Sequence, residues 1–174
     1  MMKKMKRLVA VLLAGVMALT MLTACGSKII PIERNDAVEK TVSAIAEKYE
    51  IGAMTDAETV EKLDKLANDL LDELVNSEYT SLLTADINAV AEKWEESVTA
   101  IDSYSEAIAE PMLGLSEYQA SFYYETYLDR LLSSVAGRLP EGCEYFAQVY
   151  HITNPTNAED SIWIMFAVLV APQT

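Results

Sequence analysis

Ser161 to Ala171 reads SIWIMFAVLVA, and this stretch decides the fold more than any other part of the chain. Its run of about ten apolar residues is too short to cross a membrane as a helix, which takes roughly 20. Residues with β-branched and aromatic side chains favour strands. Because its apolar residues occupy both faces, we expect a strand that is central or sandwiched.

The preceding segment predicts the partner of this strand. Cys143 to Thr153 reads CEYFAQVYHIT, which is again rich in aromatic and β-branched residues. Between the two segments lies Asn-Pro-Thr-Asn-Ala-Glu-Asp, from Asn154 to Asp160, a loop by composition. The sequence therefore predicts a two-stranded antiparallel hairpin.

Two segments upstream have apolar residues at helical spacing. The first predicted helix runs from Asp36 to Gly52, and the second runs from Thr55 to about Asn76. Each begins with the spacing of a capping box, Asp36 with Glu39 and Thr55 with Glu58. The second helix repeats its apolar residues in steps of three and four, at Val60, Leu63, Ala67, Leu70 and Leu74.

Two more helices are predicted before the hairpin. The third runs from near Thr84 to about Glu110, where Pro111 and Gly114 stop it. The fourth runs from Ser116 to about Arg138, and its apolar face is expected to hold Tyr118, Phe122, Leu128, Leu131, Leu132 and Val135. Helices followed by strands favour the α+β class. We expect residues 36–174 to form one α+β domain, in which four helices precede a two-stranded hairpin that packs on them.

The first 24 residues have the layout of an export signal. Lys3, Lys4, Lys6 and Arg7 precede a 15-residue apolar stretch from Leu8 to Leu22, in which Thr20 is the one polar residue. A basic head followed by a short apolar segment and small residues is typical of a secretory signal. The stretch ends in Leu22-Thr23-Ala24-Cys25-Gly26-Ser27.

These last residues resemble the lipobox of bacterial lipoproteins, and they are most similar to those of Firmicute surface lipoproteins. The resemblance covers about the first 27 residues. It implies cleavage between Ala24 and Cys25, with Leu22 and Thr23 completing the motif, and a diacylglyceryl group on the Cys25 thiol. Two acyl chains at one residue give the stable anchoring that a single chain does not. Residues 25–35 would then be a lipidated tether, in which Ile29, Ile30 and Ile32 either form a short edge strand or lie against the domain.

The charge of the chain limits its partners. All 27 acidic residues follow Cys25, whereas four of the 13 basic residues precede it, which leaves nine basic residues and a formal charge of −18 after the predicted cleavage. Anionic headgroups and nucleic acid phosphates repel such a body. We therefore expect no nucleic acid partner.

Chemistry-bearing residues are few. Cys143 and the single histidine, His151, are the candidates for a nucleophile and its base, but each is better explained as a partly buried residue of a strand. One histidine and one remaining cysteine argue against a zinc site, and the Asn154–Asp160 loop lacks the pattern of a calcium loop. No G-x-S-x-G, P-loop or G-x-G-x-x-G motif occurs. We expect no catalytic residue, metal or cofactor.

The fourth helix carries aromatic residues around its whole circumference, from Tyr118 to Tyr127. Most are expected to pack in the core, and an exposed stripe would suit a protein or carbohydrate partner. The sequence thus indicates a non-enzymatic lipoprotein on the extracytoplasmic face of the cell membrane, which is its outer side in a Gram-positive cell. We expect it to bind another envelope protein as an accessory subunit. The alternative is a module for a small ligand or cation, and an envelope enzyme is the least favoured reading.

Overall fold

A sheet runs through the centre of the part of the chain that the structure describes, which is residues 30–76, 87–101 and 104–172 of a computed structural model. The strand order is β1-β4-β5-β3, and β2 lies beside β4. The strands are β1 (Ile32–Arg34), β2 (Gly52–Ala53), β3 (Tyr104–Leu113), β4 (Glu144–Asn154) and β5 (Asn157–Val170). The helices are α2 (Asp36–Lys48), α3 (Ala57–Asn76), α4 (Ile87–Ile101) and α5 (Glu117–Val135), which ends in a 3-10 turn, η2 (Ala136–Arg138).

The predicted hairpin is present, but the prediction of a two-stranded sheet is wrong. β4 and β5 pair antiparallel from Glu144 with Val170 to Asn154 with Asn157. β3 adds to the free side of β5, and β1 and β2 add to the outer side of β4. The domain is still mixed α+β. β5 lies between β4 and β3 with residues buried on both faces, which explains why its sequence is apolar throughout.

The third predicted helix is too long, because residues 104–110 belong to β3. Ala107 and Ala109 pack toward α3 and α4, whereas Ile108 and Met112 pack toward α2 and α5. Both faces of the strand are therefore covered, so no alternation of polar and apolar residues marks it in the sequence. Pro111 is compatible with this strand, since β3 is an edge strand of the described sheet and proline is tolerated there.

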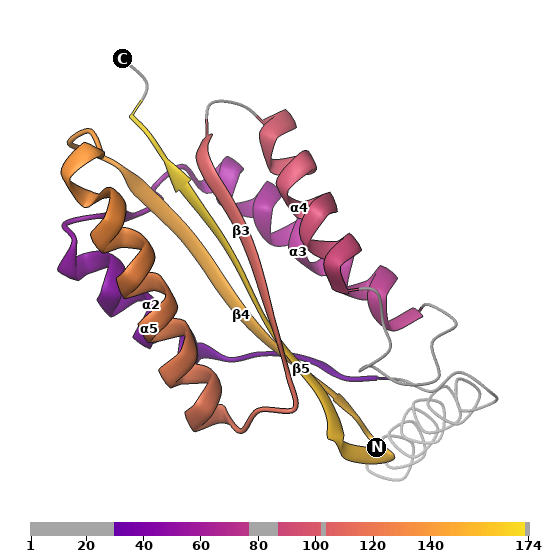
Figure 1. Cartoon of the computed structure of the whole chain (residues 1–174). Helices are drawn as coiled ribbons and strands as arrows, with labels where there is room; N and C mark the ends of the chain where they lie inside the picture. Colours follow the sequence, from indigo (N-terminus) through magenta and orange to yellow (C-terminus); the bar gives the residue numbers. More distant parts are fainter. Residues whose placement is uncertain (1–29, 77–86, 102–103, 173–174) are drawn as a thin grey trace, which may run out of the picture.

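Helices cover both faces of the sheet, as Figure 1 shows. On one side α3 and α4 bury a core around Trp94, Ile164 and Phe166. On the other side α2 and α5 bury a core around Tyr124, Trp163 and Met165. The buried positions of α3 include Leu63, Ala67, Leu70 and Leu74, which confirms the seam expected from its repeat. The molecule is thus a helix–sheet–helix sandwich.

The helix caps agree only in part with the sequence prediction. The Ser116 hydroxyl accepts from the backbone N–H of Gln119, and the Gln119 side chain accepts from the Ser116 N–H, so the two residues form a capping box at the predicted start of the fourth helix. α2 is capped instead by Asn35, whose side chain accepts from the Val38 N–H. α3 begins at Ala57, after the expected Thr55, whose backbone N–H and hydroxyl donate to Glu144. The Asp56 side chain accepts hydrogen bonds from the backbone of Glu58 and Thr59 in the first turn.

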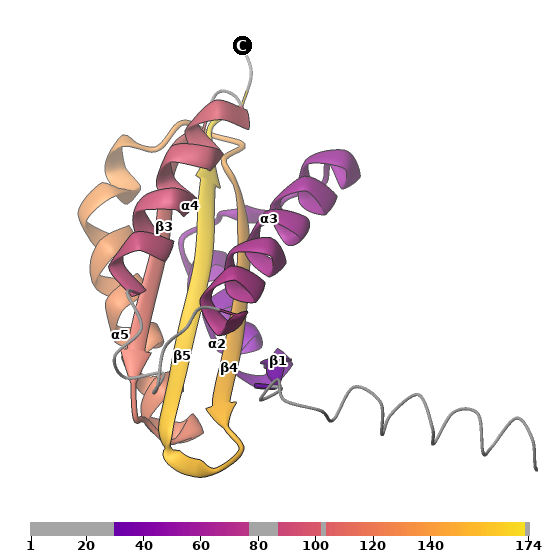
Figure 2. The same ribbon diagram turned by 90° about the vertical axis from the view of Figure 1, so that its right-hand side faces the viewer.

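β1 brings part of the expected tether into the sheet. Ile32 pairs with Ile152 and Arg34 pairs with Tyr150, so Ile32 lies in a short edge strand. Ile30 precedes this strand and packs against the core, and Ile29 lies outside the described residues. Figure 2 shows β1 against β4, near the end of the sheet where β4 turns into β5. Within the described ranges, no helix has the length and apolar character needed to cross a membrane.

Candidate functional site

The outer edge of β4 is left open between its two short neighbours. β1 pairs antiparallel with Tyr150 to Ile152, and β2 pairs parallel with Glu144 and Tyr145. Among the described residues, no strand pairs with the stretch between them on that side. The sheet therefore has a gap at Phe146 to Val149.

The backbone of Ala147 points into this gap. Val149 uses the outer edge, where its carbonyl accepts from the Asn35 N–H at 2.8 Å and its N–H donates to Glu39 Oε1 at 3.0 Å. The Tyr145 carbonyl also points outward and accepts from the Met54 N–H at 2.8 Å. Because residues of a strand alternate between its two neighbours, Ala147 directs its N–H and C=O to the same side as Tyr145 and Val149.

A groove of about 680 Å³ surrounds this position. It lies between the two helical layers, because α2 contributes Glu39 and Ser43 on one side and α3 contributes Val60, Glu61 and Asp64 on the other. The remaining lining residues come from β1, β4 and the segment around β2: Arg34, Ala53, Met54, Thr55, Ala57, Tyr145, Phe146, Ala147 and Gln148. Its volume lies in the range of about 300–1,000 Å³ that is usual for ligand sites.

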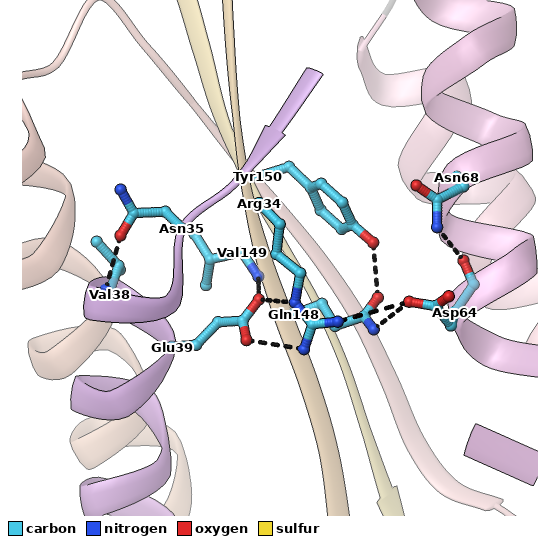
Figure 3. Close-up of polar contacts among 9 residues, drawn as sticks. All are labelled: Arg34, Asn35, Val38, Glu39, Asp64, Asn68, Gln148, Val149 and Tyr150. Carbon is cyan, nitrogen blue, oxygen red and sulfur yellow. Dashed lines mark hydrogen bonds and ion pairs between the residues drawn. The ribbon is translucent and has the colours of Figure 1, made fainter. Parts of the chain in front are cut away.

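Arg34, one of the residues that line the groove, lies between Glu39 of α2 and Asp64 of α3, as Figure 3 shows. Its guanidinium donates from Nε to Glu39 Oε1 at 2.7 Å and from a terminal nitrogen to Glu39 Oε2 at 2.9 Å. A second terminal nitrogen lies 3.6 Å from Asp64 Oδ1. The hydrogen bonds with Glu39 outweigh burial and raise the pKa of Arg34. One side chain of the sheet edge thus joins α2 to α3.

Two buried polar side chains support Asp64 from below. Gln148, which is 2% exposed, donates from Nε2 to Asp64 Oδ1 at 2.5 Å and accepts from the Tyr150 hydroxyl at 2.8 Å. Burial, followed by the nearby Asp64 carboxylate, raises the pKa of Tyr150 to about 12. Tyr150 therefore remains a neutral donor at physiological pH, and the position of the Asp64 carboxylate is fixed.

The groove carries an excess of negative charge. Glu39, Glu61 and Asp64 line it together with a single cation, Arg34, which already contacts two of these carboxylates. The lining holds no histidine or cysteine that could transfer a proton or attack a substrate. A backbone N–H and C=O beside carboxylates are groups suited to binding a peptide with a basic side chain.

The residues that the sequence singled out for chemistry lie elsewhere. The lipobox, Leu22 to Cys25, and its cleavage site lie outside the described residues. Cys143 is buried, and burial raises the pKa of its thiol. Cys143 immediately precedes β4, and His151 lies eight residues further on in that strand, about 26 Å away; the His151 ring stacks on Trp163 with centroids 4.1 Å apart. The two do not form a nucleophile–base pair.

The loop expected from Asn154 to Asp160 is shorter than predicted, because β5 begins at Asn157 and leaves only Pro155 and Thr156 between the two strands. Asn154 donates from Nδ2 to Asp160 Oδ2 at 2.6 Å, and its Oδ1 accepts from both the N–H and the hydroxyl of Thr156. Across the described ranges, no three histidine, cysteine, aspartate or glutamate side chains gather as metal ligands would. The loop therefore closes the β4–β5 turn.

The expected apolar face of α5 is wrong in its first half. Ala120 and Tyr124 are buried there, and the Tyr124 hydroxyl donates to the Glu110 carbonyl at 3.0 Å. Tyr118 and Phe122, expected in the core, are 80% and 62% exposed. They lie two residues from the buried positions, which places them on the opposite side of the helix.

Sequence reasoning missed the groove residues Arg34, Glu39, Asp64 and Gln148. One signal was available, because Gln148 interrupts the alternating face that Phe146 and Tyr150 occupy on β4. A polar residue in such a position needs a buried partner. That partner, Asp64, is 84 residues away in the sequence, so spacing could not reveal it.

Comparisons with protein families, with curated proteins and with solved structures find no match for this chain.

Proposed function

We propose that this chain is a lipid-anchored, extracytoplasmic protein that binds an extended, basic segment of another envelope protein and catalyses no reaction. The anchor is the diacylglyceryl group expected on Cys25. The binding site is the groove at Ala147. The observation that carries the proposal is the gap in the sheet edge, where a strand-edge N–H and C=O lie beside carboxylates.

The gap supports an extended peptide as the ligand. An exposed strand edge is a template for a further strand, and folded proteins usually block it. β1, β2 and the Glu39 carboxylate block the rest of this edge. An extended peptide that enters between β1 and β2 would pair its backbone with Ala147, the mode of binding known as β-augmentation.

The charge of the lining supports a basic segment. Glu61 and Asp64 would accept hydrogen bonds from a lysine or arginine, and charge-assisted hydrogen bonds of this kind are stronger than neutral ones. An acidic segment would meet like charge and lose affinity. The envelope partner is thereby described by its chemistry, an exposed extended segment with at least one basic side chain.

The anchor is tested by the intact mass of the natively expressed protein. We expect a chain that begins at Cys25 and carries acyl mass there. A chain that begins elsewhere, or one without acyl mass, would remove the membrane from the proposal and leave the groove untouched.

The groove is tested with short extended peptides that differ only in a central lysine, serine or glutamate. We expect the lysine peptide to bind most tightly and to shift the NMR signal of the Ala147 amide. Glu61→Lys should weaken that peptide about tenfold, which corresponds to 1.4 kcal/mol. Asp72→Lys makes the same charge change on an exposed position of α3 outside the groove lining and should leave the affinity unchanged.

Equal affinity for the lysine and glutamate peptides, or equal effects of the two variants, would sink the assignment of the groove. With the groove established, a photo-crosslinking residue at Glu61 in intact cells should capture an envelope protein through a basic segment. The same residue at Asp72 is the matched control.

The groove is also large enough for a small ligand, the alternative from the sequence, but its open strand edge favours an extended peptide. Another cavity lies between α2, α5 and the sheet and is lined mainly by apolar side chains such as Val42, Leu128 and Leu132. Its volume is about 40 Å³, well below the size of ordinary small-molecule sites.

A further inference from the structure

Three exposed, large apolar side chains gather at one corner of the described body. Leu113 ends β3, and Tyr118 and Phe122 follow in the first turns of α5. Their exposed fractions are 43%, 80% and 62%, and no other large apolar residue of the described ranges is exposed. Tyr118 and Phe122 are four residues apart, so they are neighbours on the helix surface. We call these three residues the apolar corner.

The apolar corner lies at the end of the sheet where the N-terminal chain enters. Ile32 pairs with Ile152, Ile152 with Ile162, and Ile162 with Leu113, so these residues form one row across the strands. Three steps of about 4.8 Å place Leu113 roughly 14 Å from Ile32. Figure 1 shows the β3–α5 connection and the β4–β5 turn at this same end, with the C-terminus at the other.

The helices bring Tyr118 closer still to the entering chain. α2 and α5 run side by side in the same direction, as contacts at three levels show. Asn35 Nδ2 donates to Glu117 Oε2 at 3.2 Å, Ser121 Oγ donates to Thr41 Oγ1 at 3.2 Å, and Lys48 Nζ donates to Asp129 Oδ1 at 2.6 Å. Both helices therefore begin at this end, and Tyr118 follows a residue that contacts the start of α2.

The short chain before β1 determines what this end faces. Four residues lie between Cys25 and Ile30, and the five Cα-to-Cα steps that join the two span at most about 18 Å. Ile30 itself packs against the core of the body. If Cys25 carries the lipid, as the proposed function states, the end of the body around Ile30 lies within that distance of the bilayer.

We propose that the apolar corner enters the interfacial region of the bilayer that holds the lipid of Cys25, which orients the body with this end toward the membrane. Tyrosine is enriched in this region because its ring is amphipathic. The acidic body is repelled by anionic lipid, so the contact is apolar and is strongest on zwitterionic membranes. This inference depends on the proposed anchor and is independent of the groove.

The test uses the full lipidated chain in phosphatidylcholine vesicles whose acyl chains carry bromine, which quenches nearby tryptophan emission. Trp94 and Trp163 are buried and provide the background. Phe122→Trp places an indole in the apolar corner. Ser134→Trp places one on the same helix, about 18 Å further along its axis. We expect the emission of the first variant to fall relative to unbrominated vesicles and that of the second to stay constant.

The outcomes separate this inference from the proposed function. Acyl mass at Cys25 with no quenching of the Phe122→Trp variant would overturn the inference and leave the anchor intact. Quenching in both variants would overturn the end-on orientation. Added phosphatidylserine should reduce the quenching, and an increase would contradict an apolar contact. Tyr118 crosslinks between copies or to another protein, without quenching, would assign the corner to a protein partner instead.

Discussion

Gln148 satisfies two polar side chains beneath the groove. Its amide donates to Asp64 and accepts from Tyr150, and both Gln148 and Tyr150 are buried. Gln148→Leu would leave the Tyr150 hydroxyl without its acceptor. We expect the free energy of unfolding in urea to fall by about 1–3 kcal/mol, the usual cost of a buried unsatisfied polar group.

The double variant Gln148→Leu/Tyr150→Phe is the control for this cost. Removing both partners leaves no unpaired hydroxyl, so part of the lost stability should return. A double variant less stable than Gln148→Leu would show that packing of the two side chains, and not their hydrogen bond, determines the effect.

His151 makes stability depend on pH. Its ring stacks on Trp163, and burial lowers its pKa. The unfolded chain therefore binds a proton at a higher pH than the folded chain does, so this histidine reduces the free energy of unfolding as pH falls from about 7 to 5. His151→Gln should flatten that decline.

The measurement is urea unfolding of both proteins across this pH range, because subtracting the two curves removes the contribution of the carboxylates. The chain has one histidine, so an NMR titration of its ring reports a single curve. A midpoint above the ordinary histidine value would contradict the expected direction.

Ser116 is the N-cap residue of α5. Its capping box satisfies N–H groups at the first turn of α5, which carries the apolar corner. Ser116→Ala should lower the free energy of unfolding by about 1 kcal/mol. Ser134→Ala, at an exposed position near the other end of the same helix, should change it little. Equal losses in the two variants would contradict a capping role.

At the level of elements, the long amphipathic helices and the β4–β5 hairpin were predictable, an edge strand at Ile32 was one of two alternatives, and β2 and β3 were not predicted. Long elements repeat their pattern often enough to be recognised. β1 and β2 have three and two residues and exist because β4 offers an edge. β3 was read as helix since Ile108 follows Ile101 at helical spacing and Pro111 resembles a helix stop.

Like the short strands, the groove forms only when segments far apart in the sequence come together in the fold, so no local sequence pattern predicted it. It consists of the space between two short strands, lined by side chains from α2, α3 and β4. Arg34 and Asp64 are 30 residues apart and come together only when α2 and α3 have packed on opposite sides of the sheet. No local sequence pattern predicts that Arg34 and Asp64 will be in contact. The expected lipobox, by contrast, is proposed from contiguous residues and depends on no fold.

At the scale of the whole molecule, net charge dominates over individual ion pairs. Pairs such as Lys62–Glu58 and Lys48–Asp129 are exposed at the surface and contribute little each. After Cys25 the chain has 27 acidic and nine basic residues, so its excess negative charges repel one another. Raising NaCl from about 0.1 M to 1 M shortens the screening length from about 10 to 3 Å and should raise the melting temperature.

Thermal unfolding at several salt concentrations checks this. Replacing the exposed Glu92, Glu95 and Glu96 of α4 with glutamine should reduce the response to salt. A melting temperature that falls with salt would show that attraction between paired charges outweighs the overall repulsion.

The way β1 joins the sheet has a mechanical consequence. β1 runs antiparallel to β4, and its first residue, Ile32, pairs with Ile152 near the end of the sheet where β4 turns into β5. Tension on the chain before β1, directed away from the body, acts along the strand and loads its paired residues together in shear, so they do not open one after another. The fork of Arg34 on Glu39, with Asp64 beyond it, lies at the far end of β1 and resists the same sliding. Under a pulling force on the N-terminus, the β1–β4 hydrogen bonds and the Arg34 contacts would therefore break together and not one by one.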